Sequence, residues 1–389
     1  MAHQRGSYDE AFHRAIRAAS SLALNRLSAT ESNEFARLLL AQEPATRKAL
    51  VEAEARMRRP EVFGRLVALS FAQRHRDPRR MLEIAEVALL VAQAFDRDQA
   101  ALAGPTSLLA SDLQAEAWAY LANARRISGE HGEAEACWRE ARKYLAAGSG
   151  DPLLAARLSA LEANLRADLR QFADAERQFH RAASLYEAAG DRHLAGRTLL
   201  DLARTFQEAG ETAKAIATLY GGASRLDLAR EPSLFVMVVH NLAGYLDVAG
   251  FPAHALRLLQ SLRDRRTSRR SRLLLLRARW LEARIAATLG LSALASETLQ
   301  RVCAGLLDMK LPYDAALAAL EMASVYAAES RHEEVQRLAE EVYPVFIARA
   351  IPREASLALL LFYRSALARE TTQELLSGLE SMLRENRRV

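Results

Sequence analysis

The sequence has little of several residue types. Only 2 of its 389 residues are cysteine, 17 are glycine, 10 are proline, and aromatic residues make up 6%. Half of the residues are nevertheless hydrophobic. This balance suits helices rich in Ala and Leu, and it suits poorly a β-sandwich built from Val, Tyr and Thr. The composition therefore predicts an all-α chain.

Long apolar runs and paired cysteines are also missing. No window reaches the roughly 18 uncharged apolar residues that a membrane span needs, and the N-terminal MAHQRGSYDEAFHRA has no apolar signal-peptide core. Cys137 and Cys303 are widely separated along the chain. A disulfide needs a Cα separation of roughly 4 to 7 Å, so we expect two free, reduced thiols. These features predict a soluble, cytoplasmic protein without membrane contact.

Lysine is scarce among the cations. The net charge is +5 and the pI is about 9.3, but only four of the 53 basic residues are lysines. An excess of arginine is typical of a GC-rich bacterial genome, so the charge alone does not indicate an anionic partner.

No catalytic motif is present in the sequence. It has no G-x-S-x-G, no P-loop, no G-x-G-x-x-G, no closely paired cysteines and no His-x-x-x-His; the His-Glu-Glu at His332 lacks the second histidine of a zincin helix. The other histidines occupy no common position in the chain's repeats. We expect no enzyme, no metal site and no cofactor.

An internal repeat dominates the chain. Alanines recur about every 40 residues, and a second series follows each by 12 residues. The first series is Ala122, Ala163, Ala203, Ala243, Ala283 and Ala323; the second is Ala134, Ala175, Ala215, Ala255, Ala295 and Val335. Between them lie Gly129, Arg170, Gly210, Gly250, Gly290 and Ser330. A fixed period of this size is typical of a solenoid.

The clearest unit, AEAWAYLANARRISGEHGEAEACWREARKYL, begins at Ala115. Small residues at a helix crossing let two backbones approach, and Gly permits the left-handed turn that ends the first helix. The spacing of its large residues, small residues and turn Gly resembles the tetratricopeptide repeat (TPR), in a long-period bacterial form. This resemblance implies a right-handed α-solenoid of antiparallel helix pairs; a HEAT or armadillo array, with a period near 40 to 47, is the competing interpretation.

Prolines support the same register. Pro152, Pro232, Pro312 and Pro352 share one phase of the period, just before the first helix of a unit, where the missing N–H is tolerated. Pro352 therefore predicts a further, degenerate unit over about 352–387.

The segment before the regular repeats is predicted to be helical as well. We expect helices at Tyr8 to Arg26, Thr30 to Gln42, Pro44 to Met57 and Pro60 to His75. The predicted organisation is an N-terminal helical segment over 1–75 that merges into a first helix pair at about 60–97, a linker over 98–111, and TPR-like repeats over 112–389.

In a TPR-like array the first helix of every unit lines a concave groove. The outward positions of these helices are Asn123, Arg126, Arg157, Asn164, Arg197, Arg204, His240, Arg277, Trp280 and Arg284. Arg and Asn bind carboxylates or grip an extended backbone, so we predict a non-enzymatic scaffold, adaptor or sensor that binds a protein or peptide of acidic character. The alternative for these arginines is a solvated helix face, and for Trp280 it is packing.

A basic stretch offers a different hypothesis. Six arginines cluster between two repeats: Arg263, Arg265, Arg266, Arg269, Arg270 and Arg272. Clustered arginines bind phosphates, so the competing function is a regulator associated with nucleic acid; a solvated basic loop is the simpler interpretation. A third possibility is a self-assembling structural array. The oligomeric state and the partner's identity do not follow from the sequence.

Overall fold

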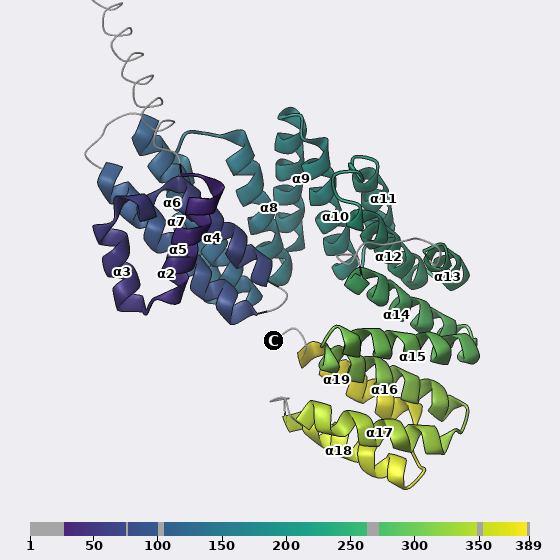
Figure 1. Cartoon of the computed structure of the whole chain (residues 1–389). Helices are drawn as coiled ribbons and strands as arrows, with labels where there is room; N and C mark the ends of the chain where they lie inside the picture. Colours follow the sequence, from purple (N-terminus) through teal and green to yellow (C-terminus); the bar gives the residue numbers. More distant parts are fainter. Residues whose placement is uncertain (1–26, 75–76, 100–104, 263–271, 348–352, 387–389) are drawn as a thin grey trace, which may run out of the picture. The chain divides into compact units, whose positions relative to one another are not determined.

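The computed structural model describes residues 27–74, 77–99, 105–262, 272–347 and 353–386. Throughout these ranges the regular structure is helical, with no strand (Figure 1). The helices are α2 (Ala29–Ala41), α3 (Pro44–Ala53), η1 (Ala55–Arg58), α4 (Pro60–Gln73), α5 (Pro78–Gln99), α6 (Pro105–Ile127), α7 (His131–Ala147), α8 (Pro152–Asp168), α9 (Phe172–Ala188), α10 (Arg192–Glu208), α11 (Thr212–Ala223), α12 (Ser233–Val248), α13 (Pro252–Gln260), α14 (Arg272–Thr288), α15 (Ser292–Asp308), α16 (Pro312–Ala328), α17 (His332–Ile347), α18 (Arg353–Leu367) and α19 (Gln373–Asn386). The all-α prediction is confirmed.

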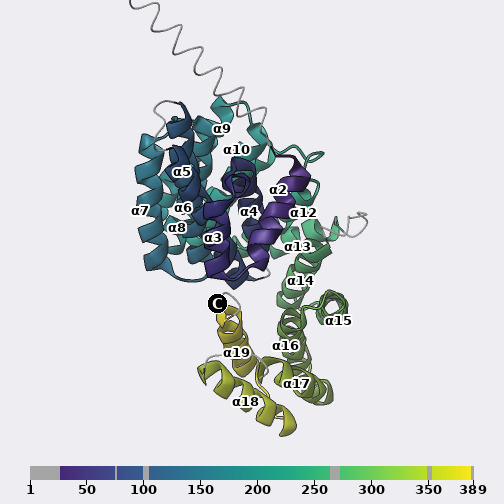
Figure 2. The same cartoon turned by 60° about the vertical axis from the view of Figure 1, so that its left-hand side comes forward.

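The chain forms two compact units, Met1–Thr198 and Leu199–Val389, and their boundary falls within α10. In unit 1, α4 packs on α5, α6 on α7 and α8 on α9; in unit 2, α12 packs on α13, α14 on α15 and α16 on α17 (Figure 2). Within each unit the first helices of successive pairs also contact one another, namely α4, α6 and α8 in unit 1 and α12, α14 and α16 in unit 2. The predicted helix pairs are confirmed.

The turn that ends each first helix has the predicted backbone. Gly129, Gly210, Gly250 and Gly290 have φ between 74° and 86°, and Arg170 and Ser330 adopt the same conformation at 59° and 58°. After α6 the N–H of Glu130 donates to the carbonyl of Arg125 at 2.9 Å, which closes a Schellman motif. The left-handed turn is therefore kept even where a side chain makes it costly.

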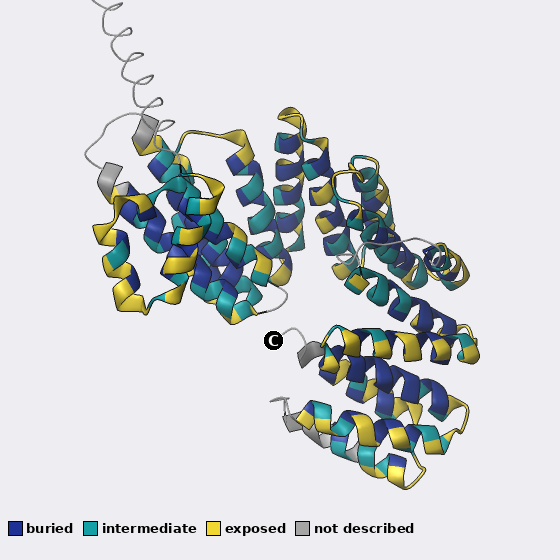
Figure 3. Ribbon diagram, viewed as in Figure 1, coloured by how far each residue is buried: buried dark blue, intermediate teal, exposed yellow. Residues whose placement is uncertain are grey.

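Both alanine series lie in the core. Every member, including Val335, is at most 2% exposed. Figure 3 shows the buried residues of the described helices in dark blue. Because a larger side chain would push the two backbones of a pair apart, the small residue at each crossing sets the distance between the helices.

The N-terminal helices pack on the first pair. α2 contacts α4 and α5, and α3 contacts α5. The helices predicted over Thr30 to Gln42, Pro44 to Met57 and Pro60 to His75 correspond to α2, α3 with η1, and α4, while Tyr8 to Arg26 lies outside the described residues. One correction concerns the linker predicted over 98–111, because α5 continues to Gln99 and α6 already begins at Pro105.

The C-terminal pair departs from the regular scheme. α18 packs on α17, and α19 packs both on α18 and back on α16. The four helices α16 to α19 thus contact one another in a closed ring, which Figures 1 and 2 both show at the end of the chain.

Candidate functional site

A pocket of about 370 Å³ lies on the first-helix face of unit 1. α4 supplies an apolar wall, and α6 and α8 supply polar groups. Its lining is Pro60, Phe63, Gly64, Val67, Ala68, Phe71, Leu113, Glu116, Tyr120 and Arg157. Gly64 and Ala68, one helical turn apart, are exposed, so this stretch of α4 has no large side chain to keep a partner backbone away.

An ion pair between Arg157 of α8 and Glu116 of α6 lies at the polar side of this pocket. Burial raises the pKa of Glu116, the charges of Asp112 and Asp151 raise it further, and Arg157 opposes them. Burial also raises the pKa of Tyr120 to about 12. The pocket therefore joins aromatic and aliphatic walls to a carboxylate and a guanidinium that already neutralise each other.

Asn123 and Arg126, both predicted for the groove, form one contact group. Asn123 is buried, and its Oδ1 accepts hydrogen bonds from Arg126 Nε at 3.2 Å and Nη2 at 3.0 Å. Arg126 Nη1 also pairs with Asp168 of α8 at 2.6 Å. These side chains thus link α6 to α8, and the charge of Arg126 is balanced within the unit.

The next predicted residues are held on their own helices. Asn164 Nδ2 donates to the carbonyl of Ala160 at 2.9 Å, and Arg204 Nη1 pairs with Glu208 at 2.5 Å. Arg197 is exposed on α10 and contributes a positive charge near Tyr186. Three of the six predicted groove arginines, Arg126, Arg157 and Arg204, thus already pair with a carboxylate of the chain.

The first-helix face of unit 2 carries a more positive group. His240 on α12 lies near Arg277 and Arg284 of α14; burial and these two charges lower the pKa of His240 to about 4. His240 Nδ1 is buried with no hydrogen-bond partner among the described residues. Arg284 is exposed. At neutral pH the imidazole is therefore uncharged, and the positive charges beside it are those of the two arginines.

Trp280, also predicted for the groove, is buried, and α19 contacts it. The guanidinium carbon of Arg384 on α19 lies 5.3 Å from the centre of the Trp280 ring. The same guanidinium pairs with Glu321 of α16, which is buried, and with Glu380 of α19 at 2.6 Å. The Trp280 ring, which was predicted to face a partner, is thus covered by Arg384 of α19.

Sequence reasoning missed the carboxylates of these faces. Glu116 and Arg157 occupy the same phase of neighbouring repeats, 41 residues apart, and Arg126 and Asp168 are 42 residues apart. Opposite charges one period apart are therefore the signal that would have predicted ion pairs between adjacent first helices. Glu321 and Arg384 have no such signal, because their contact depends on where α19 folds.

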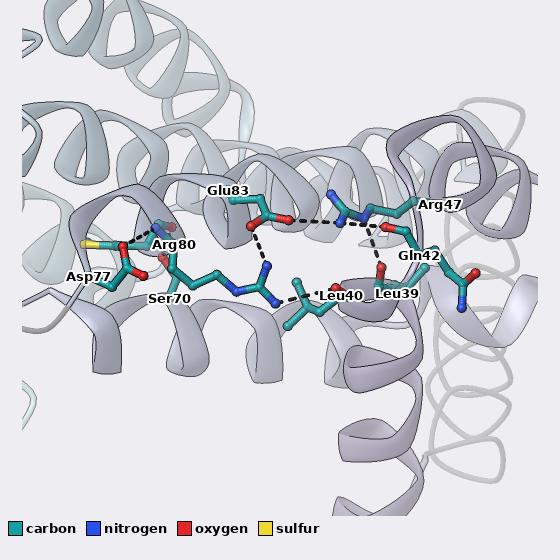
Figure 4. A network of polar contacts seen from close by, with 9 residues as sticks. Leu39, Leu40, Gln42, Arg47, Ser70, Asp77, Arg80 and Glu83 are labelled. Atoms are coloured by element: carbon teal, nitrogen blue, oxygen red, sulfur yellow. Dashed lines mark hydrogen bonds and ion pairs between the residues drawn. The ribbon is translucent and has the colours of Figure 1, made fainter.

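A second polar group, also missed, lies at the N-terminal helices (Figure 4). Arg47 is buried; it donates to the carbonyls of Leu39 at 2.9 Å and Gln42 at 3.0 Å and pairs with Glu83 at 3.0 Å. Arg80 also pairs with Glu83. Since Arg47 caps the end of α2 and ties it to α5, this group stabilises the packing of α2 and α3.

The predicted basic loop is mostly outside the described residues. Five of its arginines lie outside the described residues: Arg263, Arg265, Arg266, Arg269 and Arg270. Arg272 begins α14 and pairs with Asp308 at 2.5 Å.

Within the described ranges no cluster of His, Cys, Asp and Glu is arranged to hold a metal ion, and none of the helices there has the length and apolarity of a membrane span. Cys137 and Cys303 are free thiols, and burial raises the pKa of both, that of Cys303 to about 12.

The chain is similar to solved structures but matches no known protein family in sequence. Neither the scan against protein-family models nor the search of curated proteins found a match. Among solved structures, the chain is similar to a Signal Transduction ATPase with Numerous Domains (STAND) protein with a tetratricopeptide repeat sensor from Pyrococcus horikoshii, with TM-score 0.50 and 13% identity over 90% of this chain. The match covers 52% of the Pyrococcus protein, so this chain spans about half of its length.

Two further structures are similar at lower scores. Aspartyl phosphate phosphatase F from Bacillus subtilis has TM-score 0.46 and 12% identity, over 90% of this chain and 96% of its own. BtubC from P. vanneervenii has TM-score 0.45 and 16% identity, over 60% of this chain and 92% of its own. From the helix pairs, the left-handed turns, the buried alanines and the likeness to the Pyrococcus structure we conclude that this chain has the fold of a TPR-type helical repeat array.

Proposed function

We propose that this protein is a non-enzymatic scaffold, adaptor or sensor that binds a protein or peptide partner on the first-helix faces of its repeats. The observation that carries the proposal is the pocket among α4, α6 and α8, where three first helices bring an apolar wall and a polar group together on one surface. Concave sites of this kind, mostly apolar with a few placed polar groups, are typical of binding surfaces.

The pocket suits an apolar side chain of a partner segment. Phe63 and Val67 form the wall behind the exposed Gly64 and Ala68, so a partner helix or strand can lie close to α4. The paired charges of Glu116 and Arg157 offer an acceptor and donors to the partner's backbone without attracting one sign of charge.

The preference for an acidic partner rests on unit 2. Arg277 and Arg284 are the cations beside the neutral His240, and Arg284 also lies near Glu380, so a carboxylate of the partner would share these charges with groups of the chain.

A block of the pocket tests the proposal. Gly64 lies on α4, and a Cβ at this position would meet nothing within 4 Å, so Gly64→Gln adds a side chain at the pocket without a clash. The matched control is Gly132→Gln, at an exposed glycine of α7 that also has free space around it. The full chain and both variants are used to capture partners from native host lysate, at low and high salt and with and without nuclease.

We expect a bound protein that survives salt and nuclease, is retained by Gly132→Gln and is lost from Gly64→Gln. Identical capture by all three proteins would remove the pocket from the function. Loss of every partner on nuclease treatment would instead favour the nucleic-acid hypothesis.

A further inference from the structure

Helix α19 packs beside α16, in the place where the first helix of a further pair would lie if unit 2 continued regularly. Along α12, α14 and α16, each first helix contacts the first helix of the next pair. At the end of the array it is α19, a second helix, that packs on α16. The surface of α16 that would continue the row is therefore covered by a helix from the same chain.

The covering helix is amphipathic. Leu376, Leu379 and Leu383 are at most 1% exposed, while Met382, next to them, is exposed. Tyr313 of α16 donates a hydrogen bond from its Oη to the carbonyl of Leu383 at 2.9 Å. This contact satisfies one of the carbonyls that the last turn of a helix leaves without an intrahelical partner.

A polar contact fixes the register of α19. The Arg384 guanidinium lies over the Trp280 ring of α14 and pairs with the buried Glu321 of α16. Arg384 also pairs with Glu380 one turn earlier on α19. A cation beside an aromatic face and a buried carboxylate is a specific combination, and a shift of α19 that moved Arg384 away would take this cation from Glu321.

The polar contact contributes specificity more than strength. Two carboxylates share one guanidinium, and the desolvation of a buried ion pair offsets most of its attraction. A helix of 14 residues is marginal in water by itself, so α19 depends on this surface for its structure. An occupant held in this way can exchange with a competing helix of the same pattern.

We propose that the surface formed by Trp280, Tyr313 and Glu321 is a helix-docking site, that α19 is its resident occupant, and that a partner displaces α19 with an amphipathic helix of the same pattern. That pattern is three apolar residues at i, i+3 and i+7, followed directly by an arginine. The proposal rests on the proposed function only in taking the partner to be a protein.

The experiment uses α19 itself as the probe. A fluorescently labelled peptide with the sequence of residues 371–386, TTQELLSGLESMLREN, is titrated with the full chain and with its Leu383→Ala variant, and binding is followed by anisotropy. In the wild type the tethered helix competes at the high effective concentration of a linked segment. In Leu383→Ala that competition is weakened, so we expect the peptide to bind the variant at least about tenfold more tightly.

Two controls keep the result interpretable. A peptide carrying Arg384→Ala is expected to bind Leu383→Ala several-fold more weakly than the native peptide, and a Glu321→Gln, Leu383→Ala protein is expected to lose this difference. Equal affinity of the native peptide for wild type and Leu383→Ala, or equal binding of the two peptides, would overturn the proposal. Gly64→Gln lies in unit 1 and is expected to leave peptide binding unchanged, so this test fails or succeeds independently of the pocket.

Discussion

On the first-helix face of each unit a largely buried carboxylate pairs with an arginine, but the arginine comes from a different place in the two units. Each has a carboxylate that is more buried than its arginine: the Glu116 side chain is 16% exposed against 43% for Arg157, and Glu321 is 7% against 32% for Arg384. In unit 1 the arginine comes from the next repeat, and beside the pair there is a pocket. In unit 2 it comes from α19, which covers the surface. In both units a largely buried carboxylate on a first helix is paired with a cation. Where the cation comes from the neighbouring first helix the face has a pocket, and where it comes from α19 the face is covered.

The largest expected effect comes from weakening the docking of α19, which would open the first-helix face of unit 2 as that of unit 1 is open. Leu383→Ala removes a fully buried side chain of α19 and should cost about 2–5 kcal/mol of the docking free energy of this helix. Hydrogen exchange should quicken in α19 and on α16, and remain unchanged in α4, α6 and α8. Met382→Ala, at an exposed neighbour, is the control; faster exchange throughout unit 2 in both variants would show that α19 is not a separate element.

A second change tests the pair in unit 1. Arg157→Met leaves Glu116 in the pocket without its cation and should destabilise the fold by about 1–3 kcal/mol at neutral pH. The pKa of Glu116, already raised by burial, then rises further above its unfolded value. The cost should therefore be small at pH 4, where the carboxyl is protonated in both states, and should grow as the pH rises.

Urea unfolding of this variant at several pH values measures the effect. The control is Arg177→Met, which removes an exposed pair with Asp174 and should change stability by less than about 1 kcal/mol at every pH. A cost for Arg157→Met that does not depend on pH would mean that Glu116 is solvated.

A third prediction concerns pH and α19. Burial raises the pKa of Glu380 to about 7, while Glu321, Arg284 and Arg384 are the charged groups around it. Because this folded value lies above the unfolded one, the protonated form favours docking: the contribution is fully present below about pH 4.5 and is lost as the pH rises through 7. Exchange of α19 amides, corrected for intrinsic rates, should thus quicken from pH 6 to 8 in the wild type, and Glu380→Gln should flatten this trend. An equal trend in the variant would assign the titration to another group.

The smallest expected effect concerns one hydrogen bond of α19. Tyr313→Phe removes the bond to the Leu383 carbonyl and keeps the ring that packs edge-on against Phe346 at 5.2 Å between centres. We expect a loss of about 0.5–1.5 kcal/mol in α19 docking, visible as a modest gain in peptide binding in trans. No gain would mean that the exposed helix end satisfies this carbonyl with water.

The regular part of the fold could be predicted from the sequence because its determinants are local. An alanine at each crossing and a left-handed residue after each first helix repeat about every 40 residues, and they fix helix, turn and helix wherever they occur. Even Arg170 and Ser330, which lack the freedom of glycine, were predicted as turns from their phase.

The candidate sites could be predicted only in part. Arg126 and Arg157, both predicted for the groove, have their charges balanced by Asp168 and Glu116 of neighbouring helices. These ion pairs were not predicted, because each groove position was considered separately from the residues of the neighbouring repeat. The place of α19 could not be predicted, because its docking depends on contacts between distant parts of the chain.

The closed ring of α16 to α19 also has a kinetic consequence. Elsewhere in the array each helix contacts its near neighbours along the chain, and such local contacts form quickly. The bond between Tyr313 and Leu383 joins residues 70 positions apart, so its loop must close before the contact stabilises anything. Because α19 follows α16 in the chain and docks only after this loop has closed, the surface of α16 that α19 covers is accessible to other helices until then.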